Sequence, residues 1–147
     1  MLQPRNRGMS TTGGTTSPTS PSTAGTGAVA ETGVFAQNVR PFLDSTCGGC
    51  HSAIAPSAGM TLGGSGITSA EILDGLIGQK ASNGQFNLIE PGAPQQSWVY
   101  LKASGEAASA MCTTACDRER MPPSGSGLSA AQLTTLRDWI MSGAPRN

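Results

Sequence analysis

The only histidine of the 147-residue chain follows two closely spaced cysteines, in the segment Cys47-Gly48-Gly49-Cys50-His51. C-x-x-C-H is the attachment signature of c-type haem, because two intervening residues let both thiols reach the two vinyl groups of the porphyrin. The residue after the second cysteine then points its imidazole toward the iron, and histidine is a usual proximal ligand. We therefore expect one covalent haem c, held by Cys47 and Cys50 and ligated by His51. A large apolar group would also complete the core of a chain with only 4% aromatic residues.

Two other uses of these cysteines stay open. C-x-x-C also occurs in thioredoxin-like redox sites, but those lie between a strand and a helix, and this sequence has no clear strand pattern. A zinc-stabilised interaction module could combine Cys47 and Cys50 with Cys112 and Cys116. The C-x-x-x-C spacing of the second pair fits a zinc site less well, and zinc would not explain why His51 follows Cys50. The haem interpretation is therefore preferred.

The sixth position of a haem iron needs a different ligand, because the chain has a single histidine. Methionine is the other common ligand in electron-transfer cytochromes. Of the six methionines, Met121 precedes Pro122 and Pro123, which favour a stiff, extended backbone, and it is far enough from His51 to approach from the other face. We expect Met121 to be the ligand. Met60, or no protein ligand, is the alternative.

Composition divides the chain into two parts. Residues 1–30 are mostly Ser, Thr, Gly and Pro, which bury too little apolar surface to offset the entropy of ordering, so we expect a disordered tether. Residues 31–147 are expected to form one all-α domain, because apolar residues recur there at helical spacing. The expected helices cover 34–43, where Pro41 either kinks the helix or begins a second one, 69–77, 94–104, and a last helix capped by Ser129 and Gln132 and ended by Gly143.

Three segments of the sequence together resemble a known family. C-x-x-C-H, then PGAPQQSWVYLKAS at 91–104, then RMPPSGSGLSAAQLTTLRDWIMSGAP at 120–145 are similar to small monohaem c-type cytochrome domains, in particular the planctomycete- and myxobacterial-type modules. The resemblance extends over residues 34–145. It implies thioethers at Cys47 and Cys50, axial ligands His51 and Met121, and a class I-like, cytochrome c-like bundle of about four short helices around one covalent haem.

The same resemblance implies that the first and last helices cross, so that Phe35 and Val39 meet Trp139 and Leu136.

The family pattern does not include Cys112 and Cys116. Haem attachment takes place outside the cytoplasm, where disulfides are permitted. We therefore expect a disulfide between these two residues, which would stiffen the loop before Met121. Two free thiols, or attachment to a partner, are the alternatives.

The expected function is electron transfer and not catalysis, because His51 and Met121 would fill both axial positions and leave none for a substrate. A haem enzyme or gas-binding sensor with an open or displaceable sixth site is the alternative. A formal net charge of zero gives no indication of nucleic acid, so redox proteins are the expected partners.

The expected location is the periplasm or the extracellular cell surface, where haem attachment occurs. The first ten residues contain two arginines but no apolar run, so they are not a complete export signal. We expect the true N-terminus to be missing or the chain to be a mature form. Residues 1–30 could then tether the domain to a membrane or to the cell surface.

Overall fold

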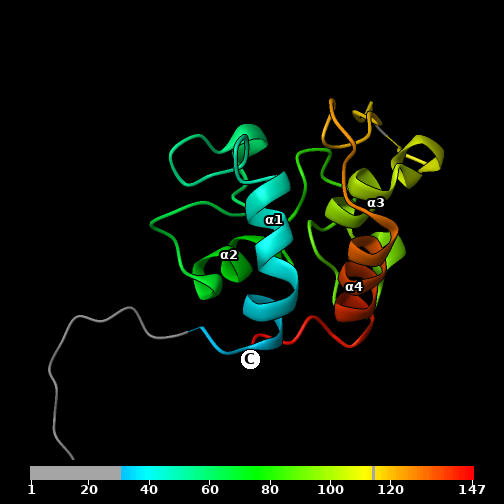
Figure 1. Ribbon diagram of the computed structural model, residues 1–147. Coiled ribbons are helices and arrows are strands. Elements are labelled where there is room, and N and C mark those ends of the chain that lie inside the picture. The colour runs from blue at the N-terminus through cyan, green and yellow to red at the C-terminus, as the bar shows by residue number, and fades with distance from the viewer. Residues whose placement is uncertain (1–30, 114) are drawn as a thin grey trace, which may run out of the picture.

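Four α-helices and four shorter helical turns make up the regular structure of the residues that the computed structural model describes, 31–113 and 115–147 (Figure 1). These residues contain isolated β-bridges but no strand, so the predicted all-α class is confirmed. The predicted tether, residues 1–30, lies outside the described part of the chain. In chain order the elements are η1 (Phe35–Val39), α1 (Arg40–Thr46), η2 (Ser57–Gly59), α2 (Ser69–Leu76), η3 (Pro94–Gln96), α3 (Trp98–Ser104), η4 (Glu106–Ser109) and α4 (Ala130–Met141).

The first helix passes through Pro41 without stopping. Proline has no N–H and its ring crowds the carbonyl one turn earlier, so a regular α-helical turn is disfavoured just before it. The chain forms a wide π-helical turn instead: the N–H of Arg40 donates to the carbonyl of Phe35, and Pro41 then lies in the first turn of α1. This turn keeps η1 and α1 contiguous and delivers Cys47 directly after the helix end.

The first and last helical segments pack against each other through aromatic side chains. The rings of Phe35 and Trp139 have centroids 5.2 Å apart, tilted by 44°. Val39 and Leu136 are fully buried in the same hydrophobic core. The two segments therefore pack together and Phe35 meets Trp139 as predicted. The carbonyl of Asn147 accepts the N–H of Val34.

Helix ends follow local signals. Thr68 and Glu71 form a capping box at the start of α2, and Gly78 has a positive φ of 70° just beyond its end. Ser129 and Gln132 form the predicted capping box of α4, whose residues Leu136, Trp139 and Ile140 are buried.

The predicted helix at 94–104 is divided into η3 and α3. Ser97 separates the two because its backbone is extended, with φ −96° and ψ 106°. Its fully buried hydroxyl donates to the carbonyl of Ala93 and accepts the N–H of Glu90. In Figure 1, α1 and α2 lie on one side and α3 and α4 on the other. The loop after α1 and the segment before α4 both rise at the end away from the C-terminus.

No helix within residues 31–113 and 115–147 has both the length and the apolar character needed to cross a bilayer.

Candidate functional site

One cavity of about 260 Å³ gathers the chemically distinctive residues of the domain. Cys47, Cys50 and His51 reach it from the end of α1, and Met121 reaches it from the segment before α4, which we call the strap (residues 117–123). Most of the remaining wall is apolar. It includes Leu43, Leu62, Leu88, Trp98, Val99 and Leu128.

The imidazole of His51 is held in one orientation. The ring is buried, and its Nδ1 lies 2.9 Å from the carbonyl oxygen of Ser57. A carbonyl oxygen only accepts, so Nδ1 carries the hydrogen and the lone pair of Nε2 is available to a metal. The backbone is fixed as well, because the N–H of His51 donates to the carbonyl of Cys47 at 2.9 Å and its own carbonyl accepts the N–H of Leu62 at 2.7 Å.

Cys47 and Cys50 are both unbonded thiols in different surroundings. Cys47 caps the C-terminus of α1 and is half-buried, whereas Cys50 is exposed. Burial, with a smaller contribution from the charge of Cys50, raises the pKa of the Cys47 thiol to about 11. Redox-active C-x-x-C sites depend on a lowered thiol pKa, so this environment disfavours the thioredoxin-like interpretation.

The two glycines between the cysteines are not equivalent. From the sequence, both positions only bridge the two cysteines, and small residues are tolerated there. However, a Cβ on Gly48 would lie 2.6 Å from the carbonyl oxygen of Asp44, while a Cβ on Gly49 would meet no atom within 4 Å. The turn that presents the two thiols therefore requires glycine at Gly48 alone.

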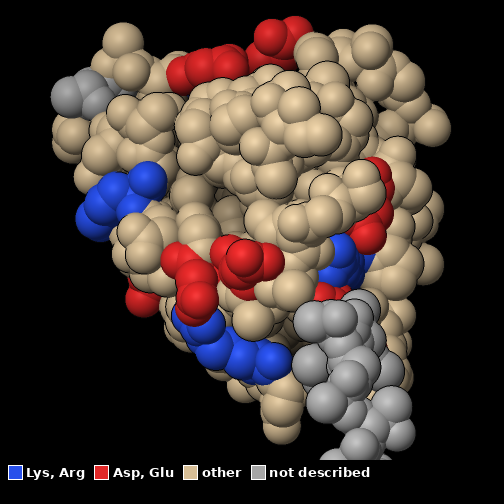
Figure 2. Space-filling view, turned by 90° about the vertical axis from the view of Figure 1, so that its left-hand side faces the viewer, with Lys and Arg blue, Asp and Glu red and all other residues tan. Residues whose placement is uncertain are grey.

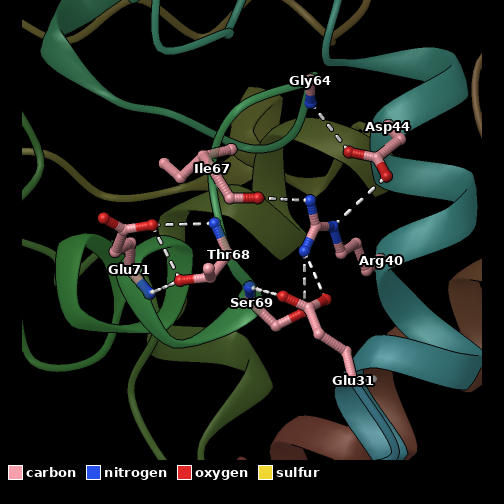
Figure 3. Close-up of polar contacts among 8 residues, drawn as sticks. All are labelled: Glu31, Arg40, Asp44, Gly64, Ile67, Thr68, Ser69 and Glu71. Atoms are coloured by element: carbon pink, nitrogen blue, oxygen red, sulfur yellow. Dashed lines mark hydrogen bonds and ion pairs between the residues drawn. The ribbon is translucent and has the colours of Figure 1, made fainter. Parts of the chain in front are cut away.

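A polar network fixes the loop beneath this turn to α1 (Figure 3). The Nη2 of Arg40 donates to the carbonyl of Ile67 at 2.6 Å, and its Nε lies 3.3 Å from the carboxylate of Asp44. Asp44 accepts the N–H of Gly64 at 2.8 Å, and Glu31 pairs with Arg40 from the other side. These contacts join residues 62–69 to the helix that delivers Cys47.

The two candidate methionine ligands lie at different parts of the cavity wall. The N–H of Met60 donates to the Ser57 carbonyl that also accepts from His51, which places Met60 on the histidine side. The N–H of Met121 donates instead to the carbonyl of Lys102 in α3 at 2.9 Å. Met111 and Met141 are exposed and do not line the cavity. Met121 therefore reaches the cavity from a different element than His51, whereas Met60 belongs to the same loop as His51; if a group bound between two ligands, Met121 would be better placed than Met60 to serve as the second.

The structure pairs Cys112 and Cys116 as a disulfide immediately before the strap. Their sulfurs are therefore not available as zinc thiolates together with Cys47 and Cys50. Among the described residues there is no cluster of three or more His, Cys, Asp or Glu side chains that could hold a metal ion. The four-cysteine zinc site is thus not supported.

Sequence reasoning assigned no role to Lys102, a charged residue of the cavity wall. Lys102 lies at helical spacing from Trp98, and its ammonium is 6.0 Å from the centroid of the Trp98 ring. It also forms an ion pair with Asp117, whose pKa is lowered first by the N–H of Glu119 and next by Lys102. The sequence shows a lysine one helical turn after Trp98, which is compatible with a contact between the two side chains. No local pattern indicates that the strap covers Lys102.

Comparison of the chain with family models, curated proteins and solved structures found no match.

Proposed function

We propose that this chain binds one haem c and transfers electrons, with thioether bonds at Cys47 and Cys50 and axial ligands from His51 and Met121. One observation carries the proposal: these four side chains, which come from two segments far apart in the sequence, line a single cavity. On this proposal, the helices form a cytochrome c-like bundle around the haem, with residues 31–147 as its domain.

The donor set has the chemistry that haem c requires. Two unbonded thiols stand one turn apart, and beside them is an imidazole whose Nδ1 is held by the Ser57 carbonyl. A thioether approaches from a different element, and the surrounding wall is mainly apolar. A bound haem supplies an iron that alternates between the ferrous and ferric states. The chain supplies ligation, exclusion of water and a fixed orientation.

Electron transfer is favoured over catalysis by the same residues. The only histidine would serve as the proximal ligand, and Met121 would fill the sixth position. Asp117 is the only carboxylate on the cavity wall, and Lys102 already binds it. The wall therefore offers no free acid–base pair beside the iron position. Methionine ligation also raises the potential, which suits a carrier that accepts electrons upstream of an oxidase.

The proposed encounter surface for a redox partner is uncharged. Cys50 is exposed, so the edge of a group bonded to it would reach the surface there. No Asp, Glu, Lys or Arg occurs between Asp44 and Glu71, and Ile54 in this segment is 89% exposed. Figure 2 shows a broad uncharged area across the upper middle of this face, with acidic side chains along its top edge and further charged groups below it. We expect partners that dock through apolar and uncharged groups, outside the cytoplasm where haem is attached.

The decisive test is covalent haem. Protein exported in a host with haem-maturation machinery should keep its colour through denaturation and acid–acetone extraction, and give a c-type pyridine haemochrome spectrum. His51→Ala should remove the proximal ligand and block maturation. Loss of all haem into the organic phase would contradict the proposal. Rapid CO binding by the reduced wild-type protein would favour the haem enzyme or gas sensor instead.

A further inference from the structure

Lys102 is a buried cation whose main partner lies in the strap. Among the residues that the structure describes, it is the only buried lysine or arginine, with 7% of its surface exposed. Its Nζ donates to the carbonyl oxygen of Asp117 at 3.1 Å and lies 2.9 Å from the Asp117 carboxylate. A charged group is buried at low cost only where it is paired and hydrogen-bonded. The strap therefore has a strong preference to lie over Lys102.

The end of α3 binds the strap at two further points. The last carbonyls of a helix have no partner within it and must find donors elsewhere. The carbonyl of Lys102 accepts the N–H of Met121 at 2.9 Å, and the carbonyl of Ala103 accepts from the Nε of Arg120 at 3.3 Å. One turn of α3 thus contacts Asp117, Arg120 and Met121.

The segment before the strap is anchored separately. The side-chain amide of Gln85 donates to the carbonyl of Met111 at 2.6 Å and accepts the N–H of Thr113 at 2.8 Å. The disulfide then closes the chain between Cys112 and Cys116. These contacts hold residues 111–116, which precede the strap. The ion pair of Lys102 with Asp117 holds the beginning of the strap itself.

We propose that Lys102 is a positioning residue whose ammonium group holds Asp117 and thereby keeps the thioether of Met121 at the cavity. The inference rests on the proposed function, in which that thioether ligates iron. An iron–thioether bond is weak, so it depends on a strap that is already in place. An external ligand can bind only when the strap opens, and its apparent affinity reports the open fraction.

Imidazole binding to the ferric holoprotein tests this role. Lys102→Met keeps the length and apolar stem of the side chain and leaves Asp117, whose side chain is 66% exposed, able to turn to solvent. We expect imidazole to bind roughly five- to tenfold more tightly, because a partly exposed charged hydrogen bond is lost. The near-infrared sulfur-to-iron band should weaken, and the Met121 amide should exchange its hydrogen faster.

Lys80→Met is the matched control. Lys80 lines the same cavity and carries the same charge, but no ion pair involves it in the described part of the chain. Its removal should leave imidazole affinity within about twofold of wild type, since Lys80 is exposed and solvent screens its charge. Equal tightening in both lysine variants would overturn the positioning role.

A second variant avoids changing the buried helix. Asp117→Ala removes the exposed partner and should also tighten imidazole binding, so it decides the question if Lys102→Met does not fold. Wild-type affinity and an intact band in either folded variant would overturn the role of Lys102 and leave the proposed function standing. Absence of covalent haem or of the band in the wild-type protein would overturn the proposed function itself.

Discussion

Replacing Gly48 with alanine should destabilise the fold, whereas the same change at Gly49 should not. A Cβ on Gly48 would lie 2.6 Å from the carbonyl oxygen of Asp44 and 3.1 Å from the backbone nitrogen of Gly64, and a side-chain rotation cannot relieve either contact. Moving the backbone would stretch the 2.8 Å bond from the Gly64 N–H to Asp44. Overpacking costs about 1–3 kcal/mol and a lost charged hydrogen bond about 1.5 kcal/mol, so Gly48→Ala should lower the free energy of unfolding by roughly 2.5–4.5 kcal/mol.

Urea unfolding of the holoprotein, followed by far-ultraviolet circular dichroism, measures this difference. The midpoint of Gly48→Ala should fall by about 1–2 M for a typical denaturant slope. Gly49→Ala introduces the same methyl group where no atom lies within 4 Å, so its free energy of unfolding should stay within about 0.5 kcal/mol of wild type. Equal midpoints for the two variants would refute the close approach of Asp44 to Gly48.

Three further predictions concern the ligand, the disulfide and the docking face. Met121→Ala should abolish the near-infrared sulfur-to-iron band, lower the reduction potential and open the iron to cyanide or CO. Met60→Ala should keep the band. The reverse pattern would assign the ligand to Met60. Under denaturing, non-reducing conditions the holoprotein should show no titratable thiol, and two reactive thiols would contradict the bridge between Cys112 and Cys116. The electron self-exchange rate should change less than about twofold between ~0.05 and ~0.5 M salt, because residues 45–70, which include the exposed Cys50, contain no Asp, Glu, Lys or Arg. A steep salt dependence would place docking elsewhere.

Helix caps and the all-α class were predictable because their signals are local. A capping box needs only Ser129 and Gln132 three residues apart, and the apolar stripe of α4 is visible in the same few residues. Pro41 was harder, because the sequence indicates that a regular turn is disfavoured without indicating which irregular turn replaces it. The structure uses a π-helical turn, which keeps the helix contiguous.

Contacts between distant segments could not be predicted in the same way. The requirement for glycine at Gly48 depends on how closely Gly64 folds back onto Asp44, and no periodicity encodes that approach. Lys102 is a similar case, since a lysine near the end of a short helix ordinarily extends into water. It is buried only because the strap crosses the end of α3, where the unpaired carbonyls of that helix need donors. The same contact between the strap and the end of α3 therefore buries the ammonium group of Lys102 and positions Met121. Substitutions at Lys102 and at Asp117 should for this reason change ligand access in the same direction.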